Sequence, residues 1–263
     1  MPGAFAATVS FVVCLGFFFQ LRVADEFKDF DEDLAHRPYR PVQRGLVTLK
    51  ELLALGVIVA AVQATLAWFL HPELLVLLGV TWAYFLLMSR EFFVRRWLQR
   101  RPIAYLASHM AIMPLIDLFA TGCDWVVAGS RPSIIGLGLF LASSYFSGVI
   151  IELGRKIRSP DDEELGVNTY SAIWGRQTAA AAWIGVMIVA AVLSVSAASH
   201  IGFAWPVAAV SLAMLAAAGF VASHFVRSPE AGLGKRLELL SGVWVIAMYT
   251  TLGVIPALLR ALA

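Results

Sequence analysis

Charged residues are scarce in this sequence. Only 14% of the 263 residues are Asp, Glu, Lys or Arg, whereas 60% are hydrophobic. Soluble domains carry about a quarter charged residues, so this composition excludes an ordinary water-soluble protein. The net charge of +2 at pH 7 gives no indication of a nucleic-acid-binding surface. We therefore expect an integral membrane protein that does not bind nucleic acid.

Cysteines and the signatures of several membrane protein classes are also lacking. Cys14 and Cys123 lie in apolar stretches and offer neither a disulfide framework nor metal-ligand spacing. No internal repeat of the kind common in secondary transporters is evident, which makes a transporter the less favoured alternative. The D-G-x-x-A-R signature of alcohol phosphotransferases is absent, and Ser143 and Ser144 lack the frame of an intramembrane serine protease.

Long apolar runs dominate instead. A membrane-crossing helix needs about 20 largely apolar residues, and its backbone groups must be satisfied within the segment, which favours helices. Such runs lie at residues 4–22, 47–70, 74–89, 103–123, 133–153, 178–198, 203–226 and 237–259. We predict an all-α, polytopic transmembrane bundle of about eight helices, forming a single domain over residues 1–263.

The basic residues are distributed asymmetrically about these runs. If the chain crosses the membrane at every run, 18 of the 20 Lys and Arg residues fall on one side, and only Arg131 and Arg260 fall on the other. Because Lys and Arg concentrate in cytoplasmic loops, we expect that side to be cytoplasmic. The prediction is a multi-pass protein of the cell (inner) membrane with both termini outside.

Two acidic clusters fall on the predicted cytoplasmic side. They hold 10 of the 18 acidic residues: Asp25, Glu26, Asp29, Asp31, Glu32 and Asp33 after the first run, and Asp161, Asp162, Glu163 and Glu164 after the fifth. In a continuous helix Asp25, Asp29 and Asp33 share one face, and their like charges repel. Mg²⁺ would relieve this repulsion, since proteins commonly hold it by one or two carboxylates plus substrate phosphates.

Basic side chains stand beside both clusters. Guanidinium groups bind phosphate oxygens strongly, and carboxylates with a divalent cation assist the departure of a diphosphate. The candidate diphosphate ligands beside the clusters are Arg22, Arg37, Lys156 and Arg158. The simpler alternative is that these are solvated loop charges at the membrane surface.

Residues 25–45 read D-E-F-K-D-F-D-E-D-L-A-H-R-P-Y-R-P-V-Q-R-G. This segment resembles the first signature of the UbiA superfamily of intramembrane prenyltransferases, N-D-x-x-D-x-x-x-D followed by R-P-x-R-P and a glycine. The acidic positions are then Asp25, Glu26, Asp29 and Asp33. Asp25 replaces the usual asparagine and Glu26 the usual aspartate. Residues 84–90 are similar to the family's Y-x-x-x-L-K-R, with Ser89 in place of lysine. This resemblance implies that Arg90 is a further diphosphate ligand.

Residues 158–176, R-S-P-D-D-E-E-L-G-V-N-T-Y-S-A-I-W-G-R, resemble the family's second signature, D-x-x-x-D before a glycine and a threonine-containing run ending in L-G-R. The matching positions are Asp162, Gly166, Thr169, Gly175 and Arg176. Arg158 stands where the first aspartate usually lies. Either Asp161 or Glu152 substitutes as a metal ligand, or Arg158 contacts phosphate directly.

The resemblance implies a reaction. A UbiA-type prenyltransferase moves an isoprenoid chain from a prenyl diphosphate to an aromatic or other lipophilic acceptor, with Mg²⁺-dependent ionisation of the diphosphate. The implied catalytic residues are Asp29, Asp33 and Asp162, and the implied metal ligands are Asp25, Glu26, Asp29, Asp33, Asp161 and Asp162. A membrane terpene cyclase acting without an acceptor is the alternative. Family members usually have nine helices, so the first is either dispensable here or the chain begins late.

Four further ionisable residues are candidates for acid-base or supporting roles: Glu91, His109, Asp117 and Glu152. Asp117 lies well inside the fourth run, where an ionisable group is costly and is a functional candidate by default. For Glu91 and His109 the simpler alternatives are an interfacial ion pair and a packed core histidine. Aromatic rings nearby, such as Phe92 and Tyr105, can stabilise a cation, although interfacial aromatics ordinarily serve as anchors.

Overall fold

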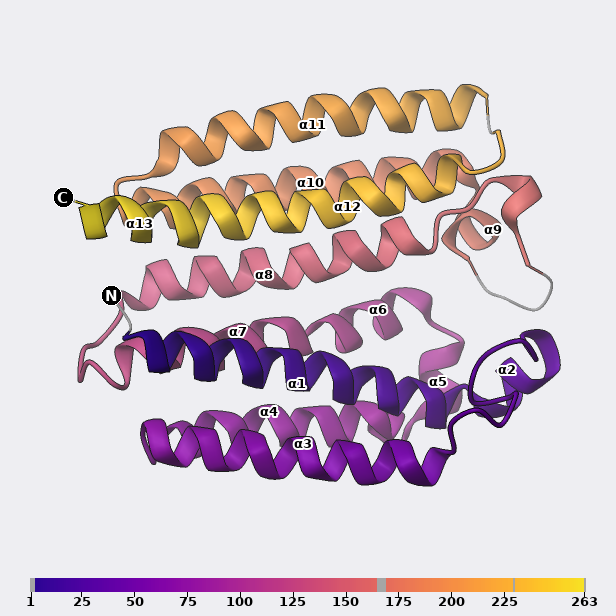
Figure 1. The fold of residues 1–263 in the computed structure, drawn as a ribbon. Coiled ribbons are helices and arrows are strands. Elements are labelled where there is room, and N and C mark those ends of the chain that lie inside the picture. The colour runs from indigo at the N-terminus through magenta and orange to yellow at the C-terminus, as the bar shows by residue number, and fades with distance from the viewer. Residues whose placement is uncertain (1–2, 165–168, 229, 263) are drawn as a thin grey trace. The chain divides into compact units, whose positions relative to one another are not determined.

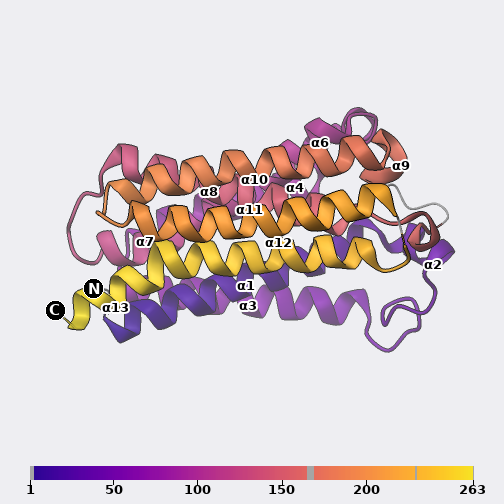
Figure 2. The same ribbon diagram turned by 90° about the horizontal axis from the view of Figure 1, so that it is seen from above.

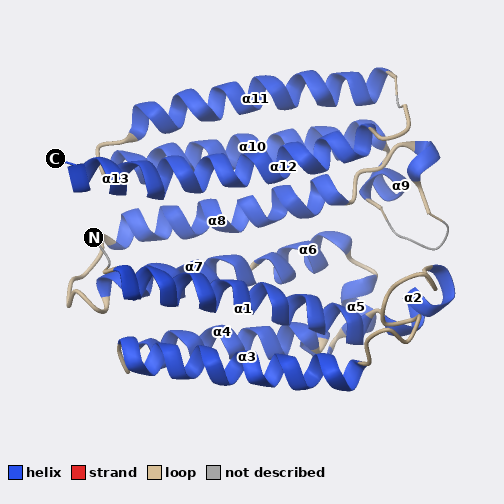
Figure 3. Cartoon of the chain, in the orientation of Figure 1, coloured by secondary structure: helices blue, strands red, loops and turns tan. Residues whose placement is uncertain are grey.

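The computed structural model describes residues 3–164, 169–228 and 230–262. Within these ranges the chain forms helices and no strand (Figure 3). In the same ranges, seven helical segments are long and apolar enough to cross a membrane, and α4 (Leu74–Ser89) is a shorter apolar helix. This confirms the predicted all-α, polytopic membrane fold. The chain divides into two compact units, Met1–Arg131 and Pro132–Ala263, and the expectation of one domain stays a prediction.

The first unit is a ring of four long helical segments (Figure 1). Its helices are α1 (Ala4–Lys28), α3 (Leu49–Leu70), α4, α6 (Pro102–Met110) and α7 (Ile112–Trp125), with the shorter α2 (Phe30–His36), η1 (Glu91–Phe93) and α5 (Arg95–Gln99). Helices α1 and α4 both pack against α3 and α7. Buried Val13, Phe17, Leu78 and Phe119 lie in the core between them. The short α2 and α5 lie at the end of the unit where α1 finishes.

The second unit repeats this arrangement. Its elements are α8 (Ile134–Arg155), η2 (Pro160–Asp162), α9 (Tyr170–Trp174), α10 (Arg176–Ser199), α11 (Ala204–Arg227), α12 (Leu233–Tyr249), η3 (Thr250–Val254) and α13 (Ile255–Leu262). Helices α8 and α11 both pack against α10 and α12 (Figure 2). In both units an acidic segment connects the first and second long helices. The sequence shows no repeat, so this shared helix order is visible only in three dimensions.

Prolines explain two departures from the predicted helices. The helix expected at 103–123 is broken at Ala111, between α6 and α7, because Pro114 has no N–H and would clash with the carbonyl of Met110. The helix expected at 237–259 begins earlier, at Leu233, and passes through the π turn η3 just before Pro256. A π turn accommodates the carbonyl groups that this proline leaves unpaired.

Large apolar side chains cover the outer faces of the long helices. Phe11, Trp205 and Phe220 are each exposed, although exposed hydrophobic patches of this kind are rare on soluble monomers. A lipid environment satisfies such faces without cost. The protein is therefore an integral membrane protein with several membrane-spanning helices.

Close contact between α8 and α12 generates a test of this packing. A Cβ atom at Gly154 would lie 2.1 Å from Ser241 Oγ and 3.1 Å from the Leu237 carbonyl oxygen. We expect Gly154→Ala to lower the free energy of unfolding by about 1–3 kcal/mol through overpacking. Thermal unfolding in detergent checks this, with Gly185→Ala in α10 as the control because a Cβ there meets nothing within 4 Å. Equal unfolding temperatures for the two variants would contradict the packing.

Candidate functional site

The first acidic motif begins inside α1 and passes through a short interruption. Helix α1 continues to Lys28, six residues beyond the predicted end, and Asp29 follows with φ −100° and ψ 8°. Backbone hydrogen bonds nevertheless run from Asp29 N to the Asp25 carbonyl (2.9 Å) and from Asp33 N to the Asp29 carbonyl (2.8 Å). The four-residue spacing of the three aspartates is thus kept in space, although α1 and α2 are separate helices.

Asp33 is the charged centre of the segment that follows. Its side chain is buried at 2% exposure and pairs with Arg40 and, at 3.6 Å between Oδ1 and Nη1, with Arg37. Both guanidiniums come from the two Arg-Pro pairs of the predicted motif. The carboxylate therefore joins α2 to the loop that follows it and fixes where two cations lie.

Glu26 is also buried, at 6% exposure. Its Oε1 pairs with Arg22 one turn earlier, while its buried Oε2 accepts no hydrogen bond from any residue the structure describes. An unsatisfied buried carboxylate oxygen is costly and suits a cation as its partner. Asp25 and Asp29 are half-buried on the neighbouring turns.

These oxygens are the hard donors that Mg²⁺ prefers. No group of three or more acidic, His or Cys side chains able to hold a metal occurs among the described residues. In a typical Mg²⁺ site the protein supplies one or two carboxylates, and substrate phosphates supply further oxygen ligands. Glu26 and one of the half-buried aspartates could supply these carboxylates.

The second acidic motif lies at the end of α8 and in η2. Asp162 accepts a hydrogen bond from the backbone N–H of Gly232 (2.7 Å), which precedes α12. Glu163 accepts hydrogen bonds from the hydroxyls of Thr169 and Ser171, each at 2.7 Å, whereas Asp161 is exposed. These contacts join the motif to α9 and to the start of α12. Gly166 lies outside the described residues.

Three basic residues near the end of α8 have acidic partners. Arg158 Nη1 lies 3.0 Å from Glu238 Oε2 on α12, and buried Glu152 pairs with Arg155 (2.6 Å) and Lys156 (2.8 Å). Arg158, which replaces the family's aspartate, therefore links the acidic motif to α12. Arg90 lies exposed at the end of α4 in the first unit.

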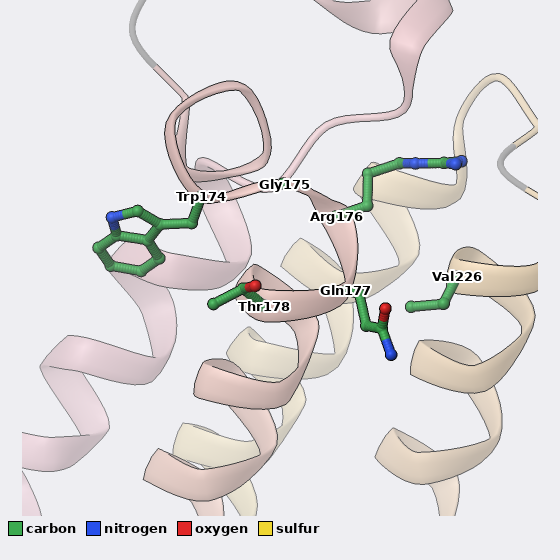
Figure 4. Close-up of a pocket in the computed structure, with 6 residues that line it drawn as sticks. All are labelled: Trp174, Gly175, Arg176, Gln177, Thr178 and Val226. Carbon is green, nitrogen blue, oxygen red and sulfur yellow. The ribbon is translucent and has the colours of Figure 1, made fainter.

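A groove of about 420 Å³ opens where α10 begins. Gly175 adopts φ 79° there, so that α9 turns sharply into α10. Figure 4 shows Trp174 and Arg176 pointing to opposite sides, with Gln177 directed toward Val226 of α11. Gly175 and Arg176, the last two positions of the predicted second signature, therefore line this groove.

Glu91 and His109 belong to a second polar group in the first unit. Glu91 is buried at 3% exposure, and its Oε1 lies 3.0 Å from Lys28 Nζ. Lys28 also donates a hydrogen bond to the Tyr105 hydroxyl. The Tyr105 ring stacks on His109, with 3.8 Å between ring centroids. The structure brings together two residues that the sequence offered separately.

Asp117 lies in the middle of α7, away from the helix ends that carry the other acidic residues of this unit. It is half-buried. Cys14 and Cys123 are both free, as the apolar sequence context predicted.

Three polar contacts had little or no signal in the sequence. Lys28 sits at a variable position of the first signature, and Glu238 lies in a mostly apolar stretch far along the chain. Gln63 is fully buried, donates to the Val13 carbonyl (2.9 Å) and accepts from Trp82 Nε1 (3.3 Å). The sequence indicates Gln63 only by its being a polar residue inside an apolar run.

The role of Asp33 can be tested through stability. We expect Asp33→Asn to lower the free energy of unfolding by about 1–3 kcal/mol, because breaking a buried ion pair costs more than an exposed one, reduced here since both arginines are partly exposed. Asp31→Asn, in the same helix but exposed, is the matched control and should leave the unfolding temperature unchanged. Identical losses in both variants would count against a central role for Asp33.

Comparison with known proteins assigns a family to this arrangement. The model of the UbiA prenyltransferase family matches residues 2–257. No curated protein and no solved structure matches the chain. The family match spans both units and both acidic motifs, so this chain belongs to the UbiA prenyltransferase family.

Proposed function

We propose that the protein ionises a prenyl diphosphate with Mg²⁺ and transfers the isoprenoid chain to a lipophilic acceptor, at the cytoplasmic face of the cell membrane. The observation that carries this proposal is the first acidic motif. Its carboxylates lie on the last turn of α1, on Asp29 and in α2, at the end of an apolar helical unit, and one buried oxygen of Glu26 is unsatisfied.

In this proposal the first motif holds metal and phosphate through different residues. One or two of the carboxylates of Asp25, Glu26 and Asp29, together with the substrate phosphates, would hold Mg²⁺, which would neutralise the charge that develops on the departing diphosphate. Asp33 is a positioning residue, because it fixes Arg37 and Arg40 by ion pairs. These preorganised cations stabilise the same developing charge without reorganisation.

The second motif contributes Asp162 and its basic neighbours. The hydrogen bond from Gly232 fixes the Asp162 carboxylate, and Glu152 holds Lys156 at 2.8 Å. Arg158 is committed to Glu238, which favours a positioning role over direct phosphate contact. Asp161, exposed beside Asp162, is the proposed substitute for the missing family aspartate.

An apolar groove of about 460 Å³ is the proposed place of the isoprenoid chain. It runs beside α4 and the α6–α7 break, lined among others by Val80, Leu87, Pro114 and Leu115. Tyr84 also lines it, and its ring contacts Phe92 of the turn that carries Glu91, with 5.5 Å between ring centroids. Tyr84 is therefore a direct contact between the groove and the turn that carries Glu91.

Diphosphate release tests this function. Purified protein with labelled geranylgeranyl diphosphate and Mg²⁺ should release diphosphate, and we expect Asp29→Asn and Asp162→Asn to reduce release by at least about 100-fold, as loss of transition-state charge stabilisation does elsewhere. Removing Mg²⁺ with a chelator should have a similar effect.

Glu32→Gln provides the control, because Glu32 is an exposed acid of the same motif at a variable position of the signature. No release with any prenyl chain length would refute the proposal, and full activity in either aspartate variant would remove that residue from the site. A cyclic hydrocarbon formed without acceptor would identify a terpene cyclase instead.

A further inference from the structure

The connection between α4 and α6 carries positive charge that no acidic side chain pairs with. Residues 93–103, here named the arginine segment, contain four exposed arginines, Arg95, Arg96, Arg100 and Arg101. The sequence has no Asp or Glu from residue 92 to residue 116. The ion pairs formed within the described part of the chain do not include these arginines. Their charge is therefore available to an anion from outside the chain.

Basic side chains of the first acidic motif differ in this respect. Arg40 pairs with Asp33, and Lys28 pairs with Glu91, so these cations have partners inside the unit. The four arginines of the arginine segment have no such partner, and their like charges repel one another. Anionic groups lying beside the segment would relieve this repulsion.

Large apolar side chains are exposed among the same arginines. Phe93 is 77% exposed, Trp97 49% and Ile103 68%. A solvated loop accounts for exposed charges but gives no reason for three large apolar side chains among them. Trp and Phe beside Lys and Arg are typical of segments that lie in the headgroup layer of a membrane. The composition of the segment therefore fits the boundary between lipid headgroups and acyl chains.

The neighbouring structure holds the arginine segment at this boundary. It connects the apolar helix α4 with the membrane-crossing segment Pro102–Trp125, and α5 lies at the end of the unit (Figure 1). Leu98 of α5 is 3% exposed, so one face of this short helix packs on the protein. Just before it, Glu91, Phe92 and Phe93 form a turn in which every φ is positive. The segment thus has an inner apolar contact and an outer face of arginines.

The arginines are arranged in a way that suits phosphate oxygens. Arg96 and Arg100 are four residues apart, which brings their side chains to one face of a helical turn. The Arg101 guanidinium lies 4.5 Å from the centroid of the Trp97 ring, and its Nη1 donates to the Trp97 carbonyl at 3.5 Å. Guanidinium groups bind phosphate oxygens with paired N–H donors. A phosphodiester group beside α5 would meet several such donors.

We propose that the arginine segment binds the headgroups of anionic phospholipids in the leaflet beside α5. The arginines take the phosphate oxygens, and Phe93, Trp97 and Ile103 contact the upper part of the acyl chains. Basic clusters next to a membrane helix attract anionic lipid in this way. A headgroup that also carries a choline cation is bound less tightly, because the arginines repel that cation. The site is separate from the acidic motifs and does not depend on the proposed reaction.

Native mass spectrometry of the full-length protein tests this binding. The protein in detergent receives phosphatidylglycerol or phosphatidylcholine with identical acyl chains, and the association constant of the first bound lipid is measured for each. We expect phosphatidylglycerol to bind about 10-fold more tightly, because each nearby arginine strengthens such binding several-fold. The triple variant Arg95→Gln/Arg96→Gln/Arg100→Gln should lose most of this preference.

The matched control is Arg227→Gln/Lys235→Gln/Arg236→Gln. These three exposed cations lie at the adjoining ends of α11 and α12, and their replacement changes the net charge by the same amount. The control should keep the lipid preference of the unchanged protein. An equal loss in both triple variants would mean a response to net charge alone, and an unaltered preference in the arginine-segment variant would overturn the proposal.

Two further measurements complete the test. Inorganic diphosphate in excess should leave phosphatidylglycerol bound, because the lipid also gains acyl-chain contacts; its complete displacement would identify a site for a soluble phosphate and reject the lipid. If the triple variant does not fold, Arg95→Gln and Arg100→Gln decide singly. A fall of the preference by about threefold in either supports the proposal, and no fall in either refutes it.

Discussion

Buried carboxylates paired with basic side chains are the interaction on which the polar end of each unit depends. A charge removed from water must find an opposite charge or a hydrogen bond, and Asp33, Glu91 and Glu152 each have a basic partner. The pairs hold the basic side chains in defined places at the ends of the apolar helices. An arrangement that meets a folding constraint also gathers acidic and basic side chains where the proposed diphosphate would bind.

The two units have the same helix order. In each, four long helical segments form a ring, and the connection between the first and second carries the acids. Each unit also has a proline-associated break in its last segment, near Pro114 and near Pro256. Breaks are tolerated in membrane helices when neighbouring helices satisfy the freed backbone groups. The common plan explains how two signatures far apart in sequence come to occupy equivalent positions.

The sequence predicts the helices and the acidic motifs because both depend on local pattern. Runs of apolar residues gave the spans to within a few residues except near Lys28, Pro114 and Leu233. The pairing of Arg158 with Glu238 joins residues 80 positions apart, and no local pattern encodes such a contact. The turn formed by Glu91, Phe92 and Phe93, which all have positive φ, could not be predicted either. Positive φ is ordinarily a property of glycine, and this turn contains none.

The shortness of α4 has a consequence for the surrounding lipid. Its 16 residues extend about 24 Å at 1.5 Å per residue, less than the hydrocarbon core of roughly 30 Å. The bilayer beside α4 must become thinner, or the turn carrying Glu91 must sit below the headgroup level. In the second case the polar turn lies beside lipid acyl chains rather than in bulk water.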